Sequence, residues 1–166
     1  MKRILAVLLL ACSFPVHAID GVSAEYGAGT RDVNLWRLGV QWKGEPAGWM
    51  ERHPRWSWYV DLSVGGWHGN EGTVHDVGLT PVFRYMKAAH GPYLEGAIGM
   101  HILSDSHIYS DLGFSTRFQF GDHVGAGYYR GNWDWQMRLQ HLSNGGMRNP
   151  NPGINFMIFR VQYHVD

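Results

Sequence analysis

The sequence predicts an all-β fold, an eight-stranded antiparallel transmembrane β-barrel of the outer-membrane type. Three observations favour it. Eight segments alternate apolar with polar residues at a period of two, charged residues fall on the strand face opposite the large apolar side chains, and the chain opens with an export signal. No later segment is apolar enough to cross a membrane as a helix, and alternating strands hide their apolar band from window averages.

The first 18 residues resemble a secretory signal peptide. Lys2 and Arg3 form a charged start, residues 4–11 an apolar stretch, and Ala18 ends a plausible cleavage site. The apolar stretch is too short to anchor the chain as a membrane helix. We therefore expect a signal peptide over residues 1–18 and one barrel domain over residues 19–166.

The composition of the mature chain excludes several function classes. Cleavage removes Cys12, the only cysteine, so no disulfide is expected. With Lys2 and Arg3 gone, 12 basic residues face 14 acidic ones, and this balance gives no support for nucleic-acid binding. The histidines do not pair at metal-ligand spacing with cysteines or clustered acids, so neither a metal nor another cofactor is expected.

The first four predicted strands lie near residues 19–30, 33–43, 55–67 and 74–86. The first two each present one apolar face, made of Val22, Ala24, Tyr26 and Ala28 and of Trp36, Leu38, Val40 and Trp42. The third is the strongest pattern, with Trp56, Trp58 and Val60 on one face. Pro81 in the fourth favours a locally unpaired position or a bulge. The turn-rich stretch 43–54 is long enough for a short helix.

The last four predicted strands lie near residues 92–103, 112–129, 133–143 and 155–165. The fifth alternates Leu94, Ile98 and Met100 with small or charged residues. The apolar faces of the sixth and eighth comprise Phe114, Phe118, Phe120, Val124 and Ala126, and Met157, Phe159, Val161, Tyr163 and Val165. Asp122 shares the apolar parity of the sixth, which predicts either a bulge or a break there.

Several charged residues fall on the face opposite the large apolar groups: Arg37, Asp61, Asp76, Arg84, Glu95, Arg117 and Arg138. In a soluble sheet they would face solvent, and the tryptophan-rich face would form the core. In an eight-stranded barrel they would fill a narrow interior as a salt-bridged network. Closure also satisfies every strand edge in lipid, where an open sheet cannot exist. These considerations favour the membrane barrel.

The seventh segment carries the candidate chemistry. Its odd positions read Trp, Trp, Met and Leu and then His141 and Ser143, so a base and a nucleophile share the lipid-facing side. If the N-terminus starts in the periplasm, this strand ends at the outer leaflet of the outer membrane. The backbones of His141 and Ser143 are about 6.6 Å apart, within reach of a histidine side chain. Residues 144–146 then offer backbone N–H groups and a side-chain amide to an oxyanion.

The run from His141 to Gly153, His-Leu-Ser-Asn-Gly-Gly-Met-Arg-Asn-Pro-Asn-Pro-Gly, resembles the active-site strand and loop of the lipid A 3-O-deacylase (PagL) family. Residues 120–127 and 81–83 are also similar to that family. The resemblance implies a barrel that hydrolyses the ester-linked acyl chain at the 3-position of lipid A. Ser143 would be the nucleophile and His141 the general base, with Asn144 and Gly146 serving the oxyanion hole. Lipid A would be the partner, and the family also includes homodimers.

One position departs from the family pattern. Asn155 stands where the family has the glutamate that orients the histidine. An amide can accept a hydrogen bond from the ring, but it cannot stabilise imidazolium by charge. Three hypotheses stay open: Asn155 suffices, Asp122 substitutes as the acid, or the enzyme is slow. Asp122 is equally compatible with a turn or capping role.

Two other functions stay open beside the outer-membrane esterase. Asn155 is compatible with a non-catalytic outer-membrane barrel that serves adhesion or membrane integrity. A soluble periplasmic lipid-binding barrel would instead place the tryptophan-rich face inside. Acyl-chain preference is not encoded in any pattern of the sequence.

Overall fold

The computed structural model describes residues 18–46, 48–69, 72–109 and 112–165. The predicted signal peptide, residues 1–18, lies outside the described residues except for Ala18, so the start of the mature chain stays a prediction. Among the helices of these ranges, none has the length and apolar character needed to cross a membrane.

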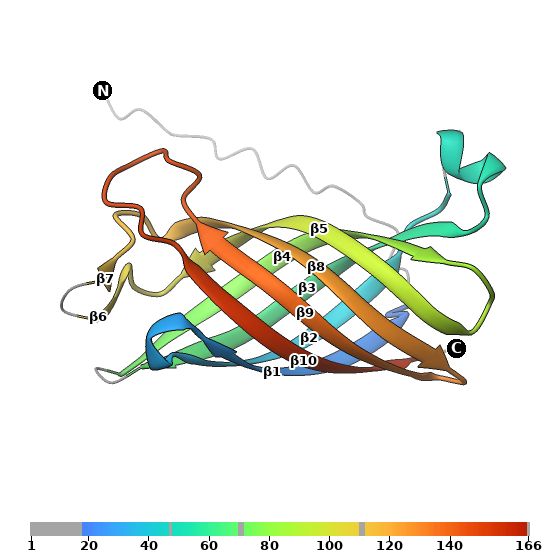
Figure 1. The fold of residues 1–166 in the computed structure, drawn as a ribbon, viewed down its shortest axis with the longest axis horizontal. Coiled ribbons are helices and arrows are strands. Elements are labelled where there is room, and N and C mark those ends of the chain that lie inside the picture. The colour runs from blue at the N-terminus through green and yellow to red at the C-terminus, as the bar shows by residue number, and fades with distance from the viewer. Residues whose placement is uncertain (1–17, 47, 70–71, 110–111, 166) are drawn as a thin grey trace, which may run out of the picture.

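Eight long strands close into an antiparallel barrel (Figure 1), which confirms the predicted fold class. The strands are β1 (Gly21–Gly29), β2 (Asn34–Lys43), β3 (Trp56–Gly69), β4 (Gly72–Met86), β5 (Gly91–Leu103), β8 (Phe118–Arg130), β9 (Trp133–Ser143) and β10 (Ile154–His164). Each pairs with the long strands before and after it in the chain, and β1 pairs with β10. The connections β1–β2, β3–β4, β5–β8 and β9–β10 lie at the end away from the C-terminus, here called the loop end.

Four short elements complete the chain. In the connection from β5 to β8, β6 (His107–Tyr109) and β7 (Leu112–Gly113) form a small two-stranded sheet. The 3-10 helix η1 (Thr30–Asp32) joins β1 to β2 at the loop end. A second 3-10 helix, η2 (Gly48–Arg52), is the short helix expected within residues 43–54.

The sixth predicted strand was placed too early. β8 begins at Phe118, and Phe114 is fully buried instead of lying on the outer apolar face. Ser115 has a φ of 59°, outside the extended region, so strand backbone cannot continue through it although the residue pattern does. Arg117 precedes β8 and is exposed, so its predicted place in the barrel interior is also wrong.

The two irregularities expected within the strands have different outcomes. The pairing of β4 with β5 is interrupted around Pro81, as its missing N–H requires. By contrast, β8 runs through Asp122 without a break, because Asp122 pairs with Ile98 on one side and His141 on the other.

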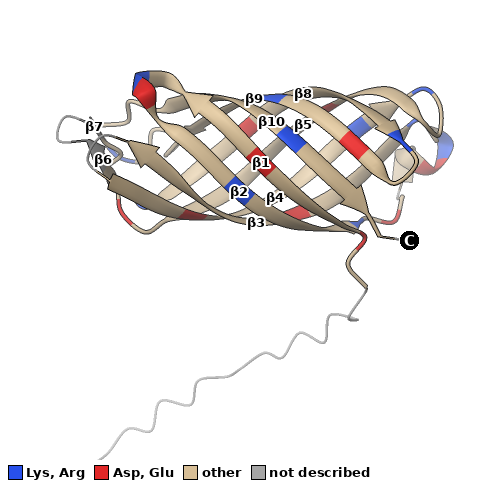
Figure 2. Cartoon of the chain, turned by 90° about the horizontal axis from the view of Figure 1, so that it is seen from below, with Lys and Arg blue, Asp and Glu red and all other residues tan. Residues whose placement is uncertain are grey.

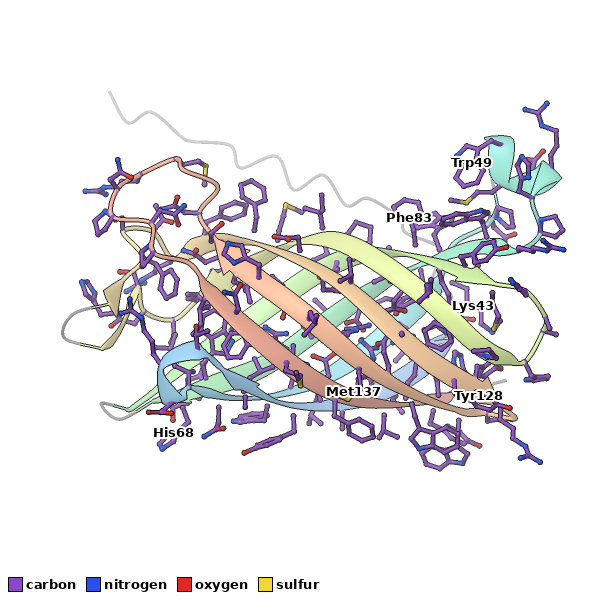
Figure 3. The ribbon with its side chains drawn as sticks, viewed as in Figure 1. Lys43, Trp49, His68, Phe83, Tyr128 and Met137 are labelled. Carbon is purple, nitrogen blue, oxygen red and sulfur yellow. The ribbon has the colours of Figure 1, made fainter. Side chains whose placement is uncertain are left out.

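The barrel wall sorts its side chains as a membrane barrel does. Outward positions of β9, including Trp133, Trp135 and Met137, are exposed, whereas Asp134 and Arg138 are buried inside. Figure 3 shows Met137 on the outside of the wall. At the end of the barrel opposite the loop end, Trp133 stacks on Trp135 and packs edge-on against Tyr163. This arrangement is typical of an interfacial aromatic girdle. The soluble barrel with an internal tryptophan face is therefore wrong.

Charged side chains fill the middle of the barrel as one ion-paired network. Its members are Arg37, Arg84, Arg138 and Arg160 with Glu25, Asp61, Asp76, Glu95 and Asp134. Figure 2 shows basic and acidic positions along the barrel strands. Glu25 alone contacts Arg138 at 2.7 Å, Arg160 at 2.9 Å and Arg37 at 3.5 Å. Because each buried charge has opposite partners at hydrogen-bonding distance, the cost of removing it from water is compensated.

The interior changes character toward the loop end. There an apolar cluster fills the barrel mouth, formed by Val33, Leu35, Trp67, Val74, Leu103, Phe114, Leu142, Ile154, Phe156 and Ile158. Trp67 connects the two regions, since its Nε1–H donates to Asp76 Oδ2 at 3.0 Å. The end of the barrel that carries the candidate site therefore rests on a packed apolar core.

We expect Glu95→Ala to destabilise the barrel strongly. Glu95 forms ion pairs with Arg138 at 2.8 Å and with Arg84 at 3.0 Å. Without Glu95, each of these two buried guanidinium groups loses one of its carboxylate partners. The free energy of unfolding should fall by about 3–5 kcal/mol. Urea unfolding of the refolded protein in detergent micelles measures this, with the exposed carboxylate variant Glu51→Ala as the control. Equal stability of the two variants would contradict the role of the network.

Candidate active site

Three polar side chains form a row across neighbouring strands on the outer wall. His141 of β9 pairs directly with Asn155 of β10 and with Asp122 of β8. All three point away from the barrel interior, Asn155 and Asp122 being exposed and His141 half-buried. Antiparallel register thus brings together residues that are 14 and 19 positions from His141 in the sequence.

Asn155 is the residue that holds the His141 ring. The distance between His141 Nδ1 and Asn155 Oδ1 is 2.7 Å. With the amide oxygen as acceptor, Nδ1 carries the hydrogen and Nε2 keeps its lone pair, which is the tautomer that a general base requires. Asn155 is itself anchored, since its backbone N–H donates to Thr30 Oγ1 of η1 at 3.4 Å.

Gly153 fits closely against the other edge of the imidazole. Its φ of 63° lies in the left-handed region, and a Cβ built there would stand 2.6 Å from His141 Cε1 and 3.1 Å from His141 Nε2. Neither the backbone nor the available space admits a side chain at this position. The glycine therefore lets the loop approach the ring and limits the ring's movement.

Ser143 ends β9 on the same face as His141 and pairs with Phe120 of β8. The N–H of Gly145 points to Ser143 Oγ at 3.5 Å. Among the contacts of the described residues there is no hydrogen bond between Ser143 Oγ and His141. Such contacts are often long in the absence of substrate and tighten in the reacting complex.

The two residues expected at the oxyanion hole lie in a hydrogen-bonded turn. The fully buried Asn144 donates from Nδ2 to the carbonyls of Arg148 at 2.7 Å and Phe114 at 3.0 Å, and its Oδ1 accepts the N–H of Gly146 at 2.9 Å. Its own backbone N–H donates to Asn151 Oδ1 at 3.0 Å. The Asn144 side chain thus organises the loop around Ser143, and Gly145 supplies the N–H directed at the serine.

A groove of about 1010 Å³ runs along the outer wall beside this row. His141, Asn155 and Asp122 line its polar part. The apolar part follows the adjacent cross-strand row, formed by Ala28, Met157, Leu139, Val124, Gly96 and Phe83. Gly96 leaves a hollow in this wall, because a Cβ there would meet no atom closer than His123 O at 3.7 Å.

The groove descends away from the loop end as it crosses the strands. His141 lies two residues from the end of β9 at Ser143, whereas Gly96 lies seven residues from Leu103, the end of β5. Phe83 lies eleven residues from Gly72, the loop-end start of β4. The strands tilt relative to the barrel axis (Figure 1), so this stagger directs the groove toward the middle of the wall.

Sequence reasoning missed four residues that support the site. Thr30, Asn151, Phe114 and Ser115 hold Asn155, the Asn144 turn and the loop that follows it. All four lie in connections between the observed strands, and alternation had placed Phe114 and Ser115 within the predicted strand 112–129. Of these four residues, Asn151 alone falls inside the motif that points to the site.

Comparison with known proteins identifies similar chains. The Pseudomonas aeruginosa protein named lipid A deacylase PagL is 31% identical over 163 residues, which cover 93% of this chain and 94% of that protein. A Bordetella bronchiseptica protein of the same name is 30% identical over 107 residues, or 64% of this chain and 56% of that protein. The crystal structure of the outer membrane enzyme PagL superposes with a TM-score of 0.74 at 26% identity, covering 87% of this chain and 99% of that one.

Designed transmembrane β-barrels share the fold alone, with a TM-score of 0.60 at 12% identity. The family model described as lipid A 3-O-deacylase (PagL) matches residues 34–164 and so includes Asp122, His141, Ser143 and Asn155. This match and the 31% identity over most of the chain show that the protein belongs to the lipid A 3-O-deacylase (PagL) family.

Proposed function

We propose that the protein is a serine esterase of the outer membrane that hydrolyses the 3-O-linked acyl chain of lipid A in the outer leaflet. The observation that carries this proposal is the His141–Asn155 hydrogen bond on the lipid-facing wall, two residues from Ser143. Membership of the lipid A 3-O-deacylase family supports the same substrate. The substrate would reach the site by lateral diffusion, since the row and the groove face outward from the barrel.

Ser143 Oγ attacks the ester carbonyl carbon while His141 Nε2 takes the hydroxyl proton. The Gly145 N–H, which points to Ser143 Oγ, is the donor placed to stabilise the negative oxygen of the tetrahedral intermediate. The N–H groups of Asn144 and Gly146 donate to Asn151 Oδ1 and Asn144 Oδ1 and hold the turn in shape. The carbon–oxygen bond to the sugar then breaks, and His141 returns the proton to the leaving sugar oxygen. Water attacks the resulting acyl-serine by the same route and releases the fatty acid.

Asn155 orients His141 in this mechanism without adding a charge. The same type of neutral partner serves the Cys-His-Asn proteases, so an amide is a workable third group. Asp122 flanks His141 from β8, but none of the hydrogen bonds among the described residues joins the two. The hydrogen bonding therefore supports Asn155 over Asp122 as the group that orients the His141 ring.

The groove gives the acyl chain a place on the barrel wall. It begins at His141 and descends along apolar side chains, in the direction that an acyl chain takes from the interface to the bilayer centre. Lipid A is the proposed partner, and assembly into a homodimer stays a prediction from the family resemblance.

Replacing either reacting group should abolish deacylation. We expect bacteria that express Ser143→Ala or His141→Ala to keep fully acylated lipid A, whereas the unaltered protein removes one 3-hydroxyacyl group. Mass spectrometry of extracted lipid A measures this loss, with heat-modifiable gel mobility as the control for folding. Activity in either variant would contradict the assigned roles. Intact lipid A with the unaltered protein would favour a non-catalytic barrel.

Variants at two positions can identify the group that orients His141. Asn155→Ala should lower kcat about fivefold, because one neutral hydrogen bond is worth about 1 kcal/mol. Asn155→Glu should raise kcat above that of the unaltered protein, since a carboxylate also stabilises imidazolium. Asp122→Ala should have the smaller effect on kcat. If Asp122→Ala is the more damaging of the two alanine variants, the acid is Asp122.

Filling the hollow at Gly96 should shorten the preferred acyl chain. Gly96→Leu adds a side chain where the groove is open, and its backbone conformation tolerates the change. We expect kcat/KM for a 14-carbon 3-acyl chain to fall at least tenfold relative to a 10-carbon chain, the discrimination typical of a pocket that loses room for methylenes. Ala24→Leu, on the outer face of β1 away from the groove, is the matched control. An unchanged ratio would place the acyl chain elsewhere.

A further inference from the structure

We propose that Phe114 is a positioning residue for catalysis, holding the Ser143 loop and the His141–Asn155 pair in place from inside the barrel. This inference rests on the proposed esterase function. Phe114 belongs to the connection between β5 and β8, yet its side chain is fully buried in the barrel mouth. A connection at the loop end thus contributes the core on which the site rests.

The ring of Phe114 belongs to the apolar cluster that includes inward residues of the strands that carry the site. It meets Trp67 edge-on at 6.2 Å between centroids, and both belong to one apolar cluster with Leu142 and Ile154. Leu142 lies between His141 and Ser143 in the chain and points inward, while Ile154 directly precedes Asn155. Since successive residues of a strand face opposite sides, movement of Leu142 or Ile154 displaces the outward catalytic groups.

The backbone around Phe114 also holds the loop that follows Ser143. The Phe114 carbonyl accepts a hydrogen bond from Asn144 Nδ2 at 3.0 Å, next to the nucleophile. Ser115 Oγ donates to the carbonyl of Pro150 at 2.6 Å, farther along the same loop. The Phe114 N–H in turn donates to Ser106 O at 2.8 Å, which fixes it to its own connection. The connection between β5 and β8 is therefore joined to the connection between β9 and β10 at two points, Asn144 and Pro150.

The cluster is in turn fixed to the barrel. Trp67 packs edge-on against Phe156 at 5.3 Å and donates its indole N–H to Asp76 of the ion-paired network. Phe114 therefore transmits the rigidity of the interior to the site. Loss of its ring leaves the strands closed but removes the support under Leu142 and Ile154. A displacement of about 1 Å at a catalytic group is enough to cost 10²-fold in rate.

The test compares Phe114→Ala, Phe114→Leu and Met50→Ala with the unaltered protein, each refolded in detergent micelles. Met50 is a buried apolar residue of η2 at the opposite end of the barrel and serves as the matched control. Heat-modifiable gel mobility reports the folded barrel, and lipid A hydrolysis gives kcat and KM separately.

We expect Phe114→Ala to lower kcat by about 10²-fold, with KM within twofold of the unaltered value. Phe114→Leu should give an intermediate kcat, between one-half and one-tenth of the unaltered value, and Met50→Ala should keep the unaltered kcat. If Phe114→Ala does not fold, a kcat for Phe114→Leu between one-half and one-tenth of the unaltered value supports the role, and a kcat above one-half overturns it. An unchanged kcat in Phe114→Ala, or an equal fall in Met50→Ala, overturns the positioning role alone. An unaltered protein that leaves lipid A intact overturns the proposed function and this inference together.

Discussion

Closure of the sheet, in which β1 pairs with β10 from Gly21 opposite His164 to Gly29 opposite Phe156, is the constraint on which the rest of the molecule depends. In lipid no water can satisfy a free strand edge, so the hydrogen-bond ladder has to be complete. Once the ladder is closed, every strand position faces either inward or outward. The outward position of His141, Ser143 and Asn155 follows from this parity.

Closure also creates an interior that eight strands make too narrow to leave empty. The protein fills it in two ways, with ion pairs in the middle and apolar side chains at the loop end. The change of filling coincides with the position of the site. An ion pair depends on the position of its partner, whereas a packed apolar cluster resists displacement from every side. Such a cluster suits the support of the candidate row formed by His141 and Asn155 on the outer wall.

The alternation of apolar and polar residues predicted all eight long strands. Successive strand residues face the lumen and the lipid in turn, so the period of two can be seen within each segment alone. Spacing and motif placed His141 and Ser143 on the lipid-facing side in the same way. The cross-strand neighbours of His141 depend on register, which no single segment encodes, so Asn155 came from family resemblance and Asp122 from parity. Phe114 and Arg117 were misplaced because the apolar pattern continues past the strand end, where Ser115 turns the backbone out of the extended region. The hydrogen bonds of Thr30 and Asn151 are tertiary contacts between connections and leave no periodic trace.

The filled interior has a consequence for the permeability of the membrane around it. Among the described residues, Arg160 in the middle and Trp67 at the mouth are almost completely enclosed, so side chains fill the lumen at both levels. A barrel with a filled lumen can be present in a membrane in many copies without opening pores through it. A barrel whose candidate active site lies on the outer surface of its wall needs no channel to bring a membrane lipid to that site.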